Sequence, residues 1–311
     1  MMQRSLRMMY GKTLTEMGAR YKNLVVLDAD LKESTQSVQF EKVYPDRFLN
    51  IGVAEQNMVG IAAGLALSGK LPVAHSFASF ISMRACEQVR TSVAYPNLNV
   101  KFVVSHAGIS CGSAGTTHHS IEDIAIMRSI PNMTVLVPGD AEEVRQSFIA
   151  AMSHHGPVYL RIGAGEAEDV YTDQQFKIGR ATRIRAGDDA TIITTGTMLQ
   201  EGLNLSDLFN EEYGIKIGLL QMASIKPIDV KAIKETSQTT KKIITIEEHN
   251  IIGGLGSAVC EVVAEYGEAK VMRIGIKDRF AGVGNAQYIM KEEGLSIDCM
   301  ALEIKRFMDI K

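Results

Sequence analysis

A single carboxylate, Glu55, stands in the stretch 50–58 of this 311-residue chain. The residues just before it, 47–51, are predicted to form a short strand, and the Ala- and Gly-rich run 58–69 is predicted to form a helix. A buried carboxylate without a partner is costly, so this position needs a reason. One interpretation is that Glu55 complements the dipole of the first helical turn. The other is a carboxyl group of raised pKa that exchanges a proton with a bound heterocycle.

Two aromatic side chains follow one strand later. The predicted strand 71–77 ends at Phe77, and the predicted helix 78–93 carries Phe80 near its start. The carboxyl ends of parallel strands form the edge at which α/β sheets bind ligands. A Phe pair at this spacing is typical of a hydrophobic core, but together with Glu55 it favours a surface that binds a planar ring.

A loop with three histidines follows the predicted strand 100–105. It carries His106, His118 and His119 among many Gly, Ser and Thr residues, and loops of this kind often bear functional groups. A metal site is a weak interpretation, because the adjacent His118 and His119 diverge and no His-x-x-x-His or Cys-x-x-Cys motif accompanies them. Hydrogen bonding to a polyhydroxylated or phosphorylated substrate suits the loop better, with His119 in a structural role.

In this order and spacing the three blocks resemble the pyrimidine-binding domain of transketolases, most specifically over 52–66. The rest of the chain resembles the transketolase C-terminal domain through 246–249 and the Gly-rich 253–259. The resemblance implies thiamine diphosphate as the cofactor. Full-length transketolases hold its diphosphate and metal with a Gly-Asp-Gly motif, which is absent here, as is a Walker-type phosphate loop. The chain is therefore expected to be the C-terminal half of a transketolase, made as a separate subunit.

The resemblance assigns cofactor-binding roles to five residues. Glu55 matches the glutamate that hydrogen-bonds N1′ of the aminopyrimidine and so promotes deprotonation of the thiazolium ring. Phe80 matches the aromatic residue that stacks on the pyrimidine, a contact of about 1 kcal/mol beyond burial, and Phe77 matches a neighbour that lines the pocket. Met83 stands where many relatives carry another aromatic residue, and its thioether can pack against a ring edge. Asp30 is expected to contact cofactor-site residues of the partner domain.

The resemblance also implies a sugar phosphate as the substrate. Its expected ligands are Arg7, Ser34, His106 and Arg161. A guanidinium is a planar donor suited to phosphate, although a solvated charge or an ion pair is the alternative for each arginine. His118 matches the histidine near the reacting carbonyl, so the catalytic candidates are Glu55, His106 and His118.

One position departs from the family pattern. Many transketolases carry an Asp where this chain has Ala114, and that Asp recognises the hydroxyl next to the substrate carbonyl. Loss of such an acceptor should relax or shift selectivity, because a contact of this kind can discriminate by several kcal/mol. Transfer of a two-carbon ketol unit is expected, but xylulose 5-phosphate and a less common ketose phosphate remain equally good donors.

The composition is that of a globular protein. With 46% hydrophobic and 22% charged residues, the chain can fill two domain cores. A net charge of −3 predicts no affinity for nucleic acid or a membrane surface, and no apolar run approaches the roughly 20 residues of a membrane span. The four cysteines lie far apart in the sequence, which favours reduced thiols and a cytoplasmic location.

Predicted strands alternate with helix-length segments, which indicates an α/β fold of two parallel-sheet domains. The polar segment 163–189 is interpreted as a linker, giving a pyrimidine-binding domain over 1–180 and a C-terminal domain over 181–311. The predicted strands are 23–28, 47–51, 71–77, 100–105, 133–138, 157–162, 190–195, 215–221, 242–247 and 270–276, and the last predicted helix is 296–309.

The expected partners follow from the missing motif. The resemblance implies an N-terminal transketolase subunit that holds most of the Mg²⁺ or Ca²⁺ site, and a homodimer of this chain within an even-numbered assembly such as a heterotetramer. The small side chains of 58–69 would permit close approach of a second copy. The alternatives are a subunit like deoxyxylulose-phosphate synthase, a 2-oxoacid dehydrogenase beta subunit, and a non-catalytic scaffold. Intact Glu55, Phe80, His106 and His118 argue against the last.

Overall fold

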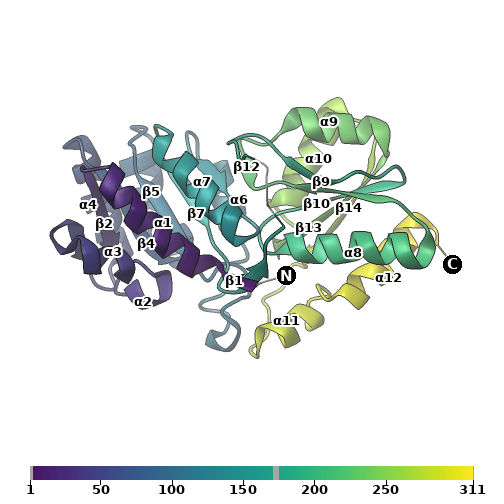
Figure 1. The fold of residues 1–311 in the computed structure, drawn as a ribbon, viewed down its shortest axis with the longest axis horizontal. Helices are drawn as coiled ribbons and strands as arrows, with labels where there is room; N and C mark the ends of the chain where they lie inside the picture. Colours follow the sequence, from purple (N-terminus) through teal and green to yellow (C-terminus); the bar gives the residue numbers. More distant parts are fainter. Residues whose placement is uncertain (1–2, 171–174, 311) are drawn as a thin grey trace.

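The computed structural model describes residues 3–170 and 175–310, so residues 171–174 of the predicted linker lie outside the described residues. Figure 1 shows two α/β domains side by side, the first drawn in purple to teal and the second in green to yellow. Each is built around its own mostly parallel sheet. The predicted fold class is confirmed.

The first domain contains a seven-stranded sheet in which all strands but the edge strand β12 run parallel. Its spatial order is β12 (Ser224–Lys226), β6 (Thr134–Leu136), β7 (Val158–Arg161), β5 (Lys101–Ser105), β4 (Leu71–Phe77), β2 (Leu24–Asp28) and β3 (Phe48–Asn50). Every residue of β4 and β5 is buried. Such continuous burial is typical of parallel strands, because helices cover both faces of their sheet.

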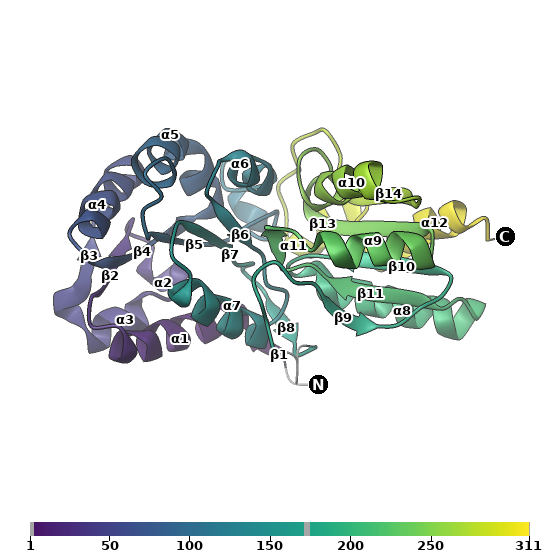
Figure 2. The same cartoon turned by 90° about the horizontal axis from the view of Figure 1, so that it is seen from above.

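Figure 2 shows these two helical layers, with α1, α3 and α7 on one face and α4, α5 and α6 on the other. The helices are α1 (Leu6–Arg20), α2 (Lys32–Thr35), α3 (Val38–Val43), α4 (Glu55–Leu67), α5 (Cys86–Gln88), α6 (Asp123–Ser129) and α7 (Ala141–Ser153). A separate hydrophobic core fills each side of the sheet. One contains Tyr10 and Phe148, and the other contains Met58 and Ile81.

The predicted helix 78–93 is not a regular α-helix. It is divided into a π-helical turn η2 (Phe80–Arg84), the short α5, and a second π-helical segment η3 (Val89–Ala94). π-Helical turns are rare and are frequent at functional sites. The widened turn η2 carries Phe80, Met83 and Arg84 together.

The second domain is built on a five-stranded sheet with the antiparallel β9 at one edge. Its order is β14 (Lys270–Ile276), β13 (Lys242–Asn250), β10 (Ala190–Thr194), β11 (Ile217–Gln221) and β9 (Thr182–Arg185). Its helices are α8 (Met198–Tyr213), α9 (Val230–Thr239), α10 (Leu255–Tyr266), α11 (Ala286–Glu292) and α12 (Ile297–Met308). Helix α8 ends where Gly214 takes a left-handed conformation (φ 65°), which a residue without Cβ adopts at no steric cost.

The sequence did not predict several short strands, one of which connects the domains. Strand β12 comes from the second half of the chain but pairs with β6 of the first sheet. Within the first domain, β1 (Gln3–Ser5) pairs with β8 (Glu166–Glu168). At the boundary between the two domains, here called the seam, Gln221 Nε2 donates to Glu143 Oε2 at 2.8 Å. Burial raises the pKa of this glutamate to about 8. The domains are therefore interlocked rather than merely linked.

Candidate active site

The predicted site residues gather at the carboxyl edge of the first sheet. Strands β5, β4, β2 and β3 are neighbours there. They end at Ser105, Phe77, Asp28 and Asn50, respectively. The segments that follow these ends carry, in the same order, the loop 106–120 with its three histidines, the π-helical turn η2, Asp30 and Glu55. Ligands bind at this edge in open α/β sheets.

Glu55 is the first residue of α4 and is fully buried. Two side chains bind its carboxylate. Ser76 Oγ donates to Oε1 at 2.8 Å, and Arg84 Nη1 donates to Oε2 at 2.6 Å. The Arg84 side chain is 43% exposed, so this ion pair joins a partly exposed guanidinium to a buried carboxylate. The Glu55 carboxylate is thus fixed at the start of α4, beside the carboxyl edge of the sheet, and Arg84 balances its charge.

Aromatic rings surround this ion pair. Phe77 and Phe80 lie nearly parallel, with centroids 5.8 Å apart. The ring of His106 lies 4.2 Å from Phe77, and His118 meets Phe80 edge-on at 5.3 Å. The Arg84 guanidinium lies 4.3 Å from the centre of Phe80. Together these side chains form a surface of flat apolar faces next to one carboxylate.

His106 follows β5 directly and adopts a left-handed backbone conformation (φ 56°), which is uncommon for a residue with a side chain. Its Nδ1 lies 2.9 Å from Ser105 Oγ. Burial, together with the charge of Arg7 and the neighbouring His118, lowers the pKa of His106 to about 4. The imidazole is therefore neutral near pH 7 and can act as either a hydrogen-bond donor or acceptor.

Arg7, Ser34 and His106, three of the four expected substrate ligands, lie together. Arg7 Nη1 donates to the Ser34 carbonyl oxygen at 2.8 Å. Burial lowers the pKa of Arg7, whose charge acts on both His106 and Cys111. The Cys111 thiol donates to the His106 carbonyl oxygen at 3.4 Å, and burial raises its pKa to about 12. Arg7 is therefore a half-buried cation beside the histidines.

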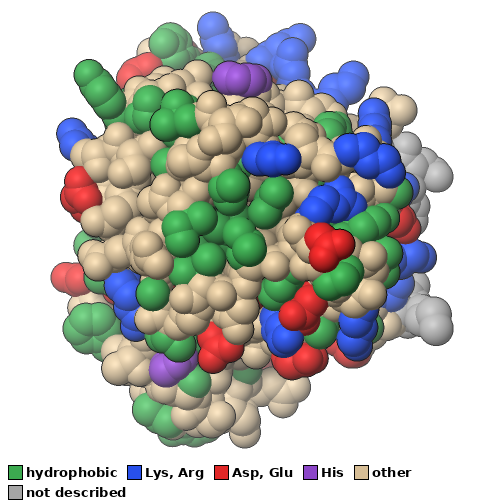
Figure 3. Space-filling model, turned by 90° about the vertical axis from the view of Figure 1, so that its left-hand side faces the viewer, with side chains coloured by type: hydrophobic (Ala, Val, Ile, Leu, Met, Phe, Trp, Pro, Cys, Tyr) green, Lys and Arg blue, Asp and Glu red, His purple; other side chains and the backbone are tan. Residues whose placement is uncertain are grey.

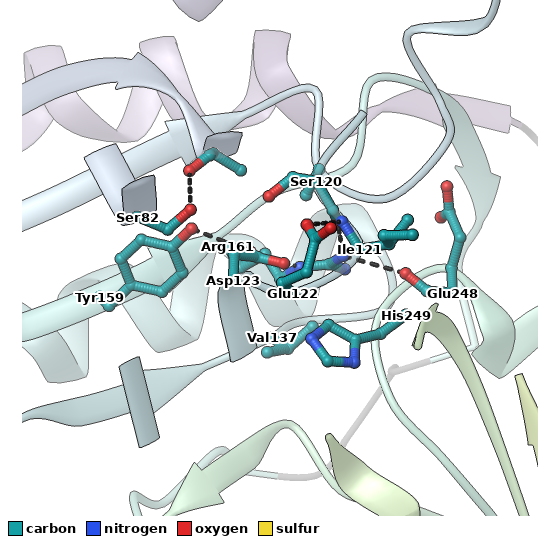
Figure 4. A network of polar contacts seen from close by, with 12 residues as sticks. Ser82, Ser120, Ile121, Glu122, Asp123, Val137, Tyr159, Arg161, Glu248 and His249 are labelled. Carbon is teal, nitrogen blue, oxygen red and sulfur yellow. Dashed lines mark hydrogen bonds and ion pairs between the residues drawn. The ribbon is translucent and has the colours of Figure 1, made fainter. Parts of the chain in front are cut away.

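Arg161, the fourth expected ligand, does not join this group. It is 4% exposed at the end of β7, and its Nε donates to Asp123 Oδ2 at 2.8 Å. Its Nη2 reaches the carbonyl oxygens of Ser120 and Glu248 at 3.3 and 3.0 Å (Figure 4). These buried contacts join the two domains and form the ion pair that was the alternative for each arginine, while the substrate role of Arg161 stays a prediction.

The remaining predicted residues lie at the rim. Asp30 is exposed in a left-handed conformation and accepts a hydrogen bond from Asn50 Nδ2 at 2.8 Å. Met83 is 59% exposed on η2. Ala114 is exposed on the short 3-10 turn η4 (Gly112–Ala114). His119 is buried, and its Nε2 lies 3.3 Å from the Gly112 carbonyl oxygen.

Sequence reasoning missed both partners of Glu55. Arg84 follows Phe80 by four residues, a spacing that places two side chains on one side of a helix. Ser76 precedes Phe77 in β4 and therefore points to the opposite face of the sheet, the face that α4 covers. Both signals were present in the sequence, but only the known position of Glu55 makes them meaningful.

A separate cavity lies apart from this cluster, and none of the residues of the cluster lines it. This cavity of about 540 Å³ lies on the seam between the domains, lined by Ser110, Thr197, Glu201, Asn204, Glu248 and Gln287 among others. The aromatic surface instead lies on an open edge of the sheet. Among the residues that the structure describes, no group of three His, Cys, Asp or Glu side chains is placed to hold a metal ion, and no helix is long and apolar enough to cross a membrane.

Comparison with known proteins adds independent information. The family "Transketolase, pyrimidine binding domain" matches residues 2–168, and "Transketolase, C-terminal domain" matches residues 179–298. A "Putative transketolase C-terminal section" of Methanocaldococcus jannaschii is 46% identical over 98% of this chain and 96% of its own length. A "6-deoxy-6-sulfo-D-fructose transketolase subunit" of a Clostridium species is 40% identical, over 94% of this chain and 90% of its own. A solved structure described as "Split gene transketolase, inactive beta4 tetramer" is 40% identical, with a TM-score of 0.90 over 99% of both chains.

Proposed function

The chain belongs to the transketolase family, and we propose that it is the pyrimidine-binding subunit of a split transketolase. In this role it transfers a two-carbon ketol unit from a ketose phosphate to an aldose acceptor, together with a second polypeptide. The observation that carries the proposal is the buried Glu55 carboxylate beside the stacked Phe77 and Phe80.

The side chains at this edge fit the aminopyrimidine of thiamine diphosphate, the cofactor of transketolases. Glu55 offers a carboxylate at the floor of the site, and Phe77 and Phe80 offer flat apolar faces for a ring. When bound, the cofactor supplies the carbon nucleophile that carries the transferred unit. We assign the diphosphate and its Mg²⁺ or Ca²⁺ mainly to the partner chain.

Each residue of the cluster has a role that its surroundings support. Glu55 holds or gives a proton at N1′ of the pyrimidine, because its buried carboxyl group binds Arg84, whose guanidinium lies on the ring of Phe80. His106, neutral at pH 7, and His118 hydrogen-bond the oxygens of the substrate around its carbonyl. Arg7, with the nearby Ser34, binds the phosphate of the substrate. Met83 on η2 packs its thioether against the edge of the bound ring, and Asp30 at the rim contacts cofactor-site residues of the partner chain.

One residue of the site, Ala114, bears on which donor sugar the enzyme accepts. Ala114 offers no acceptor to the hydroxyl next to the carbonyl, and it is exposed at the end of the 3-10 turn η4. A relative at 40% identity is named for a sulfonated sugar rather than for xylulose 5-phosphate. We therefore propose a donor preference broader than, or different from, that of transketolases with an Asp at this position.

A homodimer through α4 is the second part of the proposal. A Cβ added at Gly60 or Gly64 would meet no atom within 4 Å, so the helix presents open backbone. Val53 and Leu67, at either end of α4, are 70% and 74% exposed. Figure 3 shows hydrophobic side chains gathered on this end of the molecule. Closed two-fold dimers are the commonest solution for such a surface.

The test is the exchange of the cofactor's C2 proton with D₂O, followed by NMR in the assembled enzyme. Glu55→Gln should slow this exchange by about 10²–10⁴-fold, because the amide cannot relay a proton. Glu87→Gln, at an exposed site one turn beyond Arg84, is the control and should exchange at the wild-type rate. A wild-type rate in the Glu55 variant would show that Glu55 is structural.

A further inference from the structure

The loop 106–120, here called the His loop, is held mainly by the second domain. The strand β13 ends beside it, and the Glu248 side chain, only 6% exposed, reaches its first turn. Glu248 Oε1 accepts a hydrogen bond from the backbone N–H of Ile109 at 2.7 Å. Its Oε2 accepts from Thr197 Oγ1 at 3.0 Å, just before α8 begins. One carboxylate thus connects the His loop to two elements of the second domain.

Gly108 makes this close approach possible. Its φ is +68°, and a Cβ there would lie 2.3 Å from Glu248 Oε1, closer than real Cβ atoms come to any neighbour. Gly108 also closes the neck of the loop, since its N–H donates to the Ser120 carbonyl oxygen at 2.9 Å and its own carbonyl accepts from Ser120 N at 2.8 Å. Arg161 then joins the carbonyl oxygens of Ser120 and Glu248 (Figure 4). The neck is therefore fixed on both sides.

The tip of the loop is held by a different part of the second domain. Thr116 Oγ1 donates to the Ala281 carbonyl oxygen at 3.1 Å. Gly112 approaches the Gly284 carbonyl so closely that a Cβ would lie 2.9 Å from it, and at Gly115 a Cβ would lie 3.1 Å from Val283. His106 lies before the neck and His118 just after the tip. Both histidines therefore take their positions from a loop gripped at two points.

We infer that the second domain acts as a clamp on the His loop, and that Glu248 is the positioning residue that sets His106 and His118. The clamp determines where the two histidines lie in this chain, with or without cofactor and partner. It bears on catalysis only through the function proposed above, in which those histidines bind the substrate.

The adjacent Glu247 provides a matched control. It is also a fully buried glutamate of β13, but it accepts hydrogen bonds from the N–H groups of Leu255 and Gly256, at 2.7 and 2.8 Å. These contacts cap the N-terminus of α10 and do not involve the His loop. Replacing either glutamate removes one buried carboxylate that accepts backbone hydrogen bonds, so the two variants differ mainly in the element that they release.

The first test is hydrogen–deuterium exchange of the purified chain, followed by mass spectrometry, without cofactor or partner. Glu248→Ala should speed the exchange of amides in 107–120 by at least about tenfold, the equivalent of losing 1.4 kcal/mol of local stability. Glu247→Ala should speed exchange in α10 and leave the loop unchanged. Glu248→Gln keeps an acceptor for Ile109 and should restore most of the protection. Unchanged exchange of the loop in Glu248→Ala, or an equal increase in both alanine variants, would overturn the inference.

The second test follows the His106 ring by NMR titration, with its signal assigned through His106→Gln. The pKa of His106 is about 4 because the loop keeps the ring buried near Arg7 and His118. A released loop should move it upward toward its usual 6.5 in Glu248→Ala and leave it near 4 in Glu247→Ala. A milder variant, Thr197→Val, removes one of the contacts of Glu248 and should give an intermediate shift. An unchanged His106 titration in both Glu248→Ala and Thr197→Val would refute the clamp, whatever the activity of the assembled enzyme.

Discussion

Replacing Arg84 with methionine should destabilise the chain by about 2 kcal/mol at pH 7. Its guanidinium donates to Glu55 Oε2 at 2.6 Å, and Ser76 is the other side chain bound to this carboxylate. A hydrogen bond to a charged group contributes about 1.5–3 kcal/mol, and removing one partner of a buried pair costs about 3–5 kcal/mol. Because the Arg84 side chain is 43% exposed, water can replace part of its contribution, and the lower end applies.

A double-mutant cycle separates this pair from the packing of the arginine on Phe80. Arg84→Met, Glu55→Gln and the double variant are unfolded with urea at pH 7 and followed by circular dichroism. The coupling energy should be about 1–2 kcal/mol, because the methionine no longer leaves a charge unpaired once Glu55 is an amide. Arg90→Met, at an exposed position of η3, is the control and should change the free energy of unfolding by less than about 0.5 kcal/mol. A coupling below about 0.3 kcal/mol would refute the view that Arg84 balances the buried carboxylate.

Two further predictions concern the seam and the assembly. The pKa of Glu143 is raised from its usual 4.5 to about 8, so its contribution to stability is fully present below pH 4.5 and is lost as the pH rises through about 8. In Glu143→Gln this loss should disappear, so the free energy of unfolding of the variant should rise relative to that of the wild type by at most about 1.4 kcal/mol per pH unit between pH 4.5 and about 8, as measured by urea titrations. Parallel pH profiles of the two proteins would contradict this prediction. In solution at micromolar concentration, light scattering should give twice the 34.0 kDa of the chain. Gly64→Arg should give the monomer mass, and a monomeric wild type would exclude the homodimer.

The long elements could be predicted from the sequence because their signals are local. Strands such as β4 and β5 are short, largely hydrophobic stretches between helix-length segments, and the parallel order follows from that alternation. The three-residue strands β1, β8 and β12 carry no such signal, and the pairing of β12 with β6 depends on the docking of the two domains. The π-helical turns also escaped prediction, because a widened turn has no distinct hydrophobic period.

The site could be predicted where chain order and sheet order agree. Glu55, Phe77 and His106 each follow a strand, and neighbouring parallel strands bring such residues to one edge. Arg161 also ends a strand, yet β7 lies toward the seam, where Asp123 and the Glu248 carbonyl bind its guanidinium. A sequence cannot reveal that a second domain covers this strand end. Arg84 was missed because a charged residue on a predicted helix is ordinarily solvated, whereas this one binds the buried Glu55 carboxylate.

The most direct test of the central claim is the transfer of ketol units by this chain with and without a partner. With thiamine diphosphate and Mg²⁺, the purified chain alone should show no transfer from a ketose phosphate to an aldose. Adding a chain that carries the Gly-Asp-Gly motif should produce activity that rises linearly and saturates at one partner per chain. Robust turnover by this chain alone would contradict the claim that it holds only half of an active site.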